Sequence, residues 1–175
     1  MYFANFPVIP YDSVGNYDFK LVTNLLKRVV VRSKVKTNVS LFDTYDVKEG
    51  ETPEILADKL YDDSELHWTI LLLNDITDRY HQWPKNTNQF LAYINDKYSN
   101  VDATHHYEIS QVSGDTTIKI DIGTDNTDYP TASIVTNYEY EEDLQDKKRK
   151  IRLLDPAYLG AFVAEYEKLM AESML

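Results

Sequence analysis

The chain has 175 residues, of which 18 are Lys or Arg and 29 are Asp or Glu, so its formal net charge is -11. This charge disfavours nucleic-acid binding, because proteins that bind DNA or RNA neutralise phosphates with clustered basic residues. The 43% hydrophobic content predicts a folded protein, the lack of cysteine excludes disulfides and thiolate metal sites, and neither a signal peptide nor an apolar run of about 20 residues is found.

The first predicted region, residues 1–40, begins with a segment rich in aromatic residues and proline that has no helical or strand period. Residues 1–18 therefore predict an extended arm. Because such an arm has no core of its own, its aromatic side chains must pack on the rest of the chain or on another subunit. In residues 21–35 the hydrophobic spacing favours a helix in one part and a strand in another, and both interpretations stay open.

The second predicted region, residues 41–84, has clearer signals. Residues 45–47 predict a short strand, followed by a turn in which Gly50 takes a positive φ. Thr52 is placed to cap a helix whose first residue is Pro53. Residues 62–64 separate this helix from a second one that ends at Asn74. The expected apolar stripes are Ile55, Leu56 and Leu60 on the first helix, and Leu66, Ile70 and Leu73 on the second.

The third predicted region, residues 85–175, starts with a helix over residues 88–99. A β-hairpin follows, with strands at 107–112 and 117–122 joined by Ser113, Gly114 and Asp115. After a loop we expect a helix over 137–150, a short strand at 151–154, and a C-terminal helix from Asp155 and Pro156. The predicted fold class is α+β, with the strand-helix-helix unit, an N-terminal arm, a β-hairpin region and a C-terminal helix.

The helix over 137–150 carries acid in its first half and base in its second, which suits the helix dipole. Two pairs, Asp143 with Lys147 and Asp146 with Lys150, have the favourable i,i+4 order. We interpret the carboxylates as a solvated face or a charged contact surface. They are Glu139, Glu141, Glu142 and Asp143.

The region from Tyr45 to Ile76 resembles a LysM module, a unit with a strand written Y-x-V-x-x-G-(D/E)-T, two helices and a closing N-x-(I/L). The residues that carry the resemblance are Tyr45, Val47, Gly50, Glu51, Thr52, Ile55, Ala57, Leu66, Leu71, Asn74 and Ile76. The closing strand of such modules is not evident in the segment that follows, residues 77–86.

The wider chain resembles the baseplate wedge protein fifty-three family of contractile-tailed phages. The resemblance rests on the segments "YFANFPVIPYD", "TPEILADKLYDDSELHWTILLLNDITDRYHQWP" and "KRKIRLLDPAYLGAFVAEYEKLM". It implies a structural, non-enzymatic subunit of the virion that is assembled in the host cytoplasm and joins neighbouring wedges. The partners it implies are other baseplate wedge proteins, namely the helical wedge core and a sheath-initiator-like subunit.

The alternative function is weak binding to peptidoglycan, since LysM modules in general bind chains that contain N-acetylglucosamine. Such binding needs a shallow groove between the strand-to-helix loop and the loop after the second helix. Bulky residues near the second loop, from Leu66 to Trp68, and the acidic pair Asp62 and Asp63 argue against an open groove. A contact role between proteins is therefore favoured.

We find no sequence signal for a cofactor, a metal site or catalysis. The four histidines, His67, His81, His105 and His106, lack a metal-ligand spacing. The glycine of the segment 121–128 is wrongly placed for a calcium loop. Large aromatic side chains are instead the candidate anchors of protein interfaces. They are Tyr2, Phe3, Phe6, Trp68, Trp83, Tyr158 and Phe162.

Overall fold

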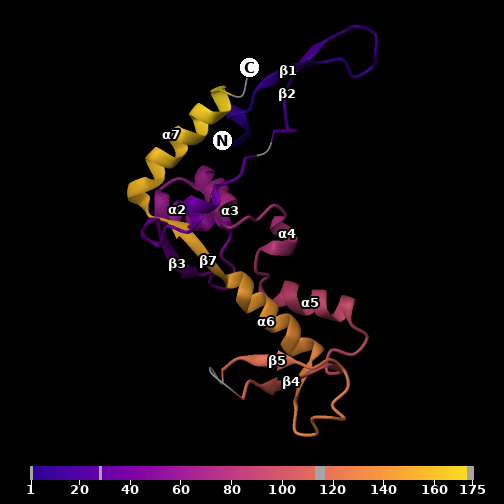
Figure 1. Ribbon diagram of the computed structural model, residues 1–175. Coiled ribbons are helices and arrows are strands. Elements are labelled where there is room, and N and C mark those ends of the chain that lie inside the picture. Colours follow the sequence, from indigo (N-terminus) through magenta and orange to yellow (C-terminus); the bar gives the residue numbers. More distant parts are fainter. Residues whose placement is uncertain (1, 28, 113–116, 173–175) are drawn as a thin grey trace. The chain divides into compact units, whose positions relative to one another are not determined.

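The computed structural model describes residues 2–27, 29–112 and 117–172 (Figure 1), and it confirms the α+β class. Packing divides the chain into two compact units: residues 1–83 with 150–175 form unit 1, and residues 84–149 form unit 2. Unit 2 is thus inserted into unit 1 along the sequence. The division into three regions with ends at residues 40 and 84 stays a prediction.

Unit 1 contains mostly short elements. They are η1 (Tyr2–Asn5), β1 (Val8–Tyr11), β2 (Lys20–Thr23), α1 (Ser33–Lys36), η2 (Val39–Leu41), β3 (Phe42–Asp46), α2 (Pro53–Tyr61), η3 (Ser64–Leu66), α3 (His67–Leu73), α4 (Arg79–Gln82), β7 (Lys150–Leu154) and α7 (Pro156–Glu172). Unit 2 contains α5 (Thr87–Lys97), β4 (Thr104–Ser110), β5 (Lys119–Asp121), β6 (Ser133–Thr136) and α6 (Asn137–Arg149).

The local signals of the strand-helix-helix unit are confirmed. Gly50 has a φ of 77° in the turn after β3, a region that costs glycine no steric strain. The Thr52 hydroxyl accepts a hydrogen bond from the Ile55 amide, and Pro53 opens α2. Asp62 ends α2 in the left-handed conformation, and the Asp63 side chain then caps η3.

The strand that closes this unit is β7, which comes from beyond the insertion. It pairs antiparallel with β3 in a register that sets Thr44 opposite Arg152 (Figure 1). Ile151 and Leu153 of β7 complete a core with residues of the β3–α2 turn and both helices. The buried members of this core are Val47, Leu56, Ala57, Ile70, Trp83, Ile151 and Leu153. The sequence segment directly after α3 therefore gave no closing strand because the strand lies elsewhere in the chain.

Asn74 attaches the end of α3 to this distant strand. Its side-chain amide donates to the Ile70 carbonyl over 2.9 Å and to the Arg152 carbonyl over 2.8 Å. Its side-chain oxygen accepts from the Arg152 amide over 2.9 Å. The amide thus satisfies both backbone groups of Arg152, an arrangement that only a side chain with a donor and an acceptor can make.

The expected stripe on α2 is only partly correct. Leu56 is buried and Leu60 packs on the core, but Ile55 is 42% exposed. The reason is geometric: Leu56, Ala57 and Leu60 lie within an arc of about 100° around the helix, and Ile55 lies roughly 150° from the centre of that arc, so it faces solvent. The buried neighbour of Leu56 is instead Ala57.

The N-terminal segment is more ordered than an extended arm. Residues 2–5 form the turn η1, and β1 pairs antiparallel with β2 in a hairpin that sets Ile9 opposite Val22. The ambiguous stretch that follows contains the strand β2 and the short helix α1. The hydrophobic spacing favoured a helix over residues 21–29 and a strand over residues 29–35, and the structure has the reverse order: the strand lies in the first part and the helix in the second.

Unit 2 contains a three-stranded antiparallel sheet in the order β5-β4-β6. The expected pairing of the hairpin strands is confirmed by the register that sets Ile109 opposite Ile120. Its predicted turn, Ser113 to Asp115, lies outside the described residues. The third strand, β6, begins at the end of the segment expected to be a loop. The helices over 87–97 and 137–149 are confirmed.

Glu141 corrects the interpretation of the acidic helix as a solvated face. It is 1% exposed, and one carboxylate oxygen accepts from Lys97 Nζ over 2.6 Å and from the Tyr98 hydroxyl over 2.9 Å. Burial alone would raise the pKa of Glu141, but these hydrogen bonds hold it below the usual range. Asp143 does pair with Lys147 as expected, over 2.5 Å, whereas Asp146 pairs with Arg149.

We predict that Asn74→Ala lowers the free energy of unfolding of the chain by about 2–3 kcal/mol, because the buried backbone groups of Arg152 lose their partner. Urea unfolding monitored by far-UV circular dichroism measures the loss. Asn95→Ala, on the exposed face of α5, is the control and should change the stability by less than about 0.5 kcal/mol. Equal stability of the Asn74→Ala variant and the wild type would contradict this role.

We predict that Glu141→Gln destabilises unit 2 by about 2–3 kcal/mol at pH 7, since Lys97 loses its charged partner. The lowered pKa of Glu141 means that this stability is present above the unfolded pKa of about 4.3 and is lost as the pH falls through the folded pKa. The gap between variant and wild type should therefore narrow below about pH 4. Hydrogen exchange of the α5 and α6 amides measures this difference in stability, and the Glu142→Gln variant, at an exposed position, is the control. A difference in stability between variant and wild type that does not change with pH would contradict the role of ionised Glu141 as the partner of Lys97.

Candidate interaction surfaces

An aromatic cluster joins the N-terminal turn to α3 and α7. The Trp68 and Tyr166 rings lie 4.5 Å apart between centroids, and Tyr2 stacks on Tyr166 at 5.5 Å. Phe6 and Trp68 are buried, and Phe162 stacks on Trp68 at 6.2 Å. The Tyr166 hydroxyl donates to the Tyr2 carbonyl over 2.7 Å, so the cluster fixes the first residues of the chain to the C-terminal helix.

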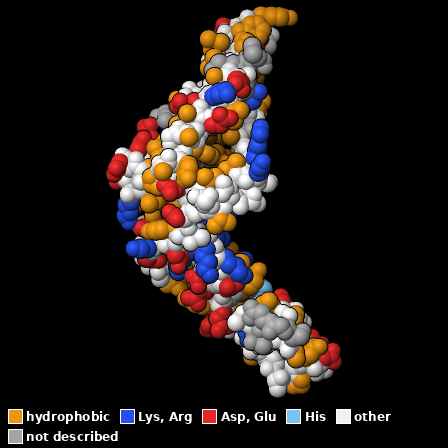
Figure 2. Space-filling view, turned by 60° about the vertical axis from the view of Figure 1, so that its left-hand side comes forward, with side chains coloured by type: hydrophobic (Ala, Val, Ile, Leu, Met, Phe, Trp, Pro, Cys, Tyr) orange, Lys and Arg blue, Asp and Glu red, His pale blue; other side chains and the backbone are white. Residues whose placement is uncertain are grey.

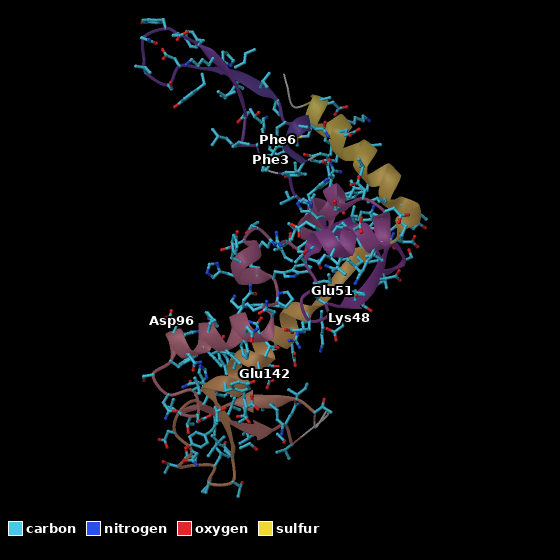
Figure 3. All side chains as sticks on the ribbon, turned by 180° about the vertical axis from the view of Figure 1, so that it is seen from behind. Phe3, Phe6, Lys48, Glu51, Asp96 and Glu142 are labelled. Atoms are coloured by element: carbon cyan, nitrogen blue, oxygen red, sulfur yellow. The ribbon has the colours of Figure 1, made fainter. Side chains whose placement is uncertain are left out.

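The structure thus brings five of the seven candidate anchors together, since Phe3 packs at the border of the cluster with its ring centroid 5.0 Å from that of Tyr2. It separates the other two, Trp83 and Tyr158. Tyr2, Phe6, Trp68 and Phe162 belong to the aromatic cluster. Phe3, beside Phe6 in Figure 3, is 54% exposed, and Tyr158 on the first turn of α7 is 45% exposed. Trp83 lies in the other core, where its indole donates to the Glu51 carbonyl over 2.9 Å. The role of all seven in interfaces stays a prediction.

The hairpin β1–β2 presents hydrophobic side chains to solvent on both of its faces. By the register, Pro10 and Leu21 share one face, and Ile9 and Val22 share the other. No helix lies across either face in Figure 1. The large exposed side chains of this segment are Val8, Tyr11, Val14, Tyr17, Phe19, Leu21, Val22, Leu25 and Leu26. Sequence reasoning recognised the aromatic residues of this segment but missed the hairpin.

Asp12 orders the tip of the hairpin. One of its carboxylate oxygens accepts from the amides of Val14, Gly15 and Asn16, and the other accepts from the Tyr17 amide over 2.7 Å. These hydrogen bonds hold the pKa of Asp12 below its usual range against the opposing effect of desolvation. The tip is therefore a defined turn that places its apolar side chains outward.

Glu51 organises the turn between β3 and α2. Its carboxylate accepts from Lys59 Nζ over 2.6 Å, from the Tyr45 hydroxyl over 2.8 Å and from the Lys48 amide over 2.9 Å. Figure 3 shows Lys48 and Glu51 close together in this turn. Burial would raise the pKa of Glu51, but the three hydrogen bonds lower it. The shape of the turn thus depends on a buried, ionised carboxylate.

The two loops that would border a sugar groove are joined directly to each other. Trp83 binds the backbone of Glu51, and Arg79 Nη1 lies 2.6 Å from a carboxylate oxygen of Glu54 in the first turn of α2. The segment after α3 therefore folds back onto the start of α2. These two contacts bridge the loops between which a groove was expected.

The described residues hold no group of three or more His, Asp or Glu side chains arranged to bind a metal. His105 stacks on Tyr140 at 3.9 Å, and its Nδ1 lies 2.9 Å from Nδ1 of His106. Both rings are therefore packed in unit 2 between β4 and α6.

Across residues 2–27, 29–112 and 117–172, no helix has the length and apolar character needed to cross a membrane.

The molecule is an α+β protein that exposes apolar side chains on the hairpin β1–β2. Comparison with known families gives a match to the family described as "Base plate wedge protein 53" over residues 1–172. The chain therefore belongs to this family and is a structural protein of a bacteriophage tail baseplate. A curated relative, "Baseplate wedge protein gp53" of Enterobacteria phage T4, is 25% identical over 186 residues, which cover 97% of this chain and 88% of the relative.

We predict that Trp68→Ala lowers the free energy of unfolding by about 3–5 kcal/mol, because it empties the centre of the aromatic cluster. Tyr158→Ala removes an aromatic side chain of similar size from an exposed site and should cost less than about 0.5 kcal/mol. Urea midpoints of the two variants measure the difference. Similar midpoints would show that Trp68 does not hold the terminal segments together.

Proposed function

We propose that this protein is a non-catalytic connector that joins neighbouring subunits of the baseplate wedge during assembly in the host cytoplasm. Membership of the baseplate wedge family supports a role in assembly. The observation that carries the finer proposal is the hairpin β1–β2, which exposes apolar side chains on both faces. An isolated two-stranded hairpin is only marginally stable in water, and exposed apolar patches of this kind mark protein contacts.

A hairpin that is apolar on both faces can be covered on both sides. A single partner groove, or the surfaces of two subunits, would bury residues such as Tyr11 and Leu21 at the same time. At roughly 25 cal/mol per Å2 of apolar surface removed from water, a few such side chains supply enough energy to hold an interface once the cost of association is met. We propose the helical wedge core and the sheath-initiator-like subunit as the partners.

We further propose that the unit β3-α2-α3-β7 is LysM-like and serves protein contacts. Its support is the position of the motif residues: Val47 and Ala57 are in the core, Thr52 caps α2, and Asn74 binds the closing strand. The direct contacts of Trp83 with Glu51 and of Arg79 with Glu54 favour this use over peptidoglycan binding. Each motif residue named here has a structural task within the chain.

The decisive experiment replaces residues 8–23 by a short Gly-Ser linker. The base of the hairpin is closed, since the Asn24 amide donates to the Pro7 carbonyl over 2.8 Å, and the linker can therefore span it while Tyr2 and Phe6 stay in the aromatic cluster. We expect the variant to fold and to lose co-elution with purified wedge proteins of the same phage in size-exclusion chromatography with light scattering. Unchanged co-elution would rule out the hairpin as the connector.

A double substitution tests the apolar side chains of the hairpin while the hairpin itself is kept. Tyr17→Ser with Leu21→Ser removes two exposed side chains of the hairpin, and Val39→Ser removes an equally exposed apolar side chain elsewhere in unit 1. We expect complex formation to weaken by about tenfold or more in the double variant and to stay at the wild-type level in the control. Equal weakening in both would point to a general loss of solubility.

A further inference from the structure

Most hydrophobic residues of the unit 2 sheet lie on the face that looks away from the helix packed on it, and Val135, opposite His106, lies on the other face. His106 is buried and meets the Tyr140 ring of α6 edge to face, with centroids 6.0 Å apart. Glu108 shares the face of His106 and lies 3.2 Å from its Nε2. The face of β4 that α6 covers is therefore polar, the reverse of the usual pattern in which a helix covers the apolar face.

Among the described residues, the opposite face of the sheet is mostly hydrophobic. Strand alternation places Tyr107 and Ile109 on it, and the register adds Ile120 opposite Ile109 and Ile134 opposite Tyr107. The Ile122 amide donates to the Tyr107 carbonyl, which brings Ile122 into the same row. We call these residues, together with Ile118, the unit 2 apolar face. Ile118, Ile120 and Ile134 are 49%, 44% and 56% exposed.

Acidic residues border this face. The loop that joins the outer strands β5 and β6 passes the end of the sheet and carries Asp125 and Asp128. The connecting loop, residues 122–132, contains these two Asp residues and neither Lys nor Arg. Lys119 does not offset them, because its Nζ donates to the Ser110 hydroxyl on the polar side of the sheet. Figure 2 shows hydrophobic side chains at the surface of this unit beside acidic ones.

We propose that the unit 2 apolar face is a docking surface for a folded protein whose own apolar patch is rimmed by Lys or Arg. Electrostatic complementarity selects this occupant, since an apolar centre with an acidic border attracts and orients a basic-rimmed patch. A second copy of this chain would bring two acidic loops together in a symmetric contact and is disfavoured. Anionic lipid and nucleic acid are disfavoured for the same reason.

The probes are the purified baseplate wedge proteins of the same phage, each tested separately against the full chain by biolayer interferometry. The double variant Ile120→Thr/Ile134→Thr removes apolar surface from the face and keeps β-branched residues that suit a strand. For at least one wedge protein we expect its dissociation constant to rise by about tenfold or more. Ile55→Thr, at a similarly exposed isoleucine of unit 1, should leave the constant unchanged.

The acidic border is tested separately, by the association rate and its dependence on salt. Asp125→Asn/Asp128→Asn should slow association by about threefold or more at about 50 mM NaCl and reduce the dependence of the rate on salt. Asn can still accept the hydrogen bonds that Asp125 takes from Thr127, so the loop keeps its turn. Melting temperatures of all variants within a few degrees of the wild type exclude unfolding as the cause.

Three results would overturn the proposal. The first is that the isoleucine variant binds every wedge protein as the wild type does. The second is that the wild type forms a dimer in light scattering that this variant dissolves, which would make a second copy the occupant. The third is that neutralising Asp125 and Asp128 leaves the rate and its salt dependence unchanged. The hairpin replacement in unit 1 should keep this binding, so failure of the connector role and failure of this proposal are distinguishable.

Discussion

The pairing of β3 with β7 is the constraint on which the rest of unit 1 depends. The core around Ile70 is incomplete without Ile151 and Leu153, which lie beyond the whole of unit 2 in the sequence. Closing so long a loop is costly in entropy, and the pairing is secured by the amide of Asn74, which binds both backbone groups of Arg152. The same strand leads into α7, and α7 in turn anchors the N-terminal turn through Tyr166 and Tyr2. The turn η1 and the helix α7 are therefore both positioned by a single long-range strand pair.

Local sequence signals predicted those parts of the fold that are decided within a few residues. Gly50, Thr52 and Asp62 set the turn, the start and the end of α2 through backbone geometry and capping, which do not depend on distant parts of the chain. The partner of β3 could not be predicted in this way, since nothing near the unit indicates which distant segment completes it. Glu141 illustrates the same limit: its helix pattern is that of a solvated acid, and only the fold brings Lys97 and Tyr98 to it.

Aromatic composition identified candidate anchors but did not distinguish internal from external ones. Trp68 and Phe3 are equally plausible from sequence, yet Trp68 is buried against α7 and Phe3 is half exposed. The hairpin was not predicted because its loop, residues 12–19, is longer than the common hairpin turns of about 2–5 residues that a sequence pattern marks. Asp12 orders this loop through hydrogen bonds to four backbone amides. Whether a side chain is buried depends on which surfaces the tertiary fold brings together. The alternation of hydrophobic and polar residues along a strand does not specify this on its own.

The two apolar surfaces belong to different units and differ in chemistry. The hairpin of unit 1 is a thin ribbon with Lys20 among its apolar residues, whereas the unit 2 apolar face is a broad sheet bordered only by acids on its connecting loop. A ribbon fits a groove, and a flat face with a charged border fits another flat face of opposite charge. The two proposed docking surfaces thus differ in the chemistry of the partner that each would fit, and they need not compete for the same subunit. A chain with two such non-equivalent surfaces can hold two different neighbours at once, and its net charge of -11 limits association with its own copies. This combination is what a connector between unlike subunits requires.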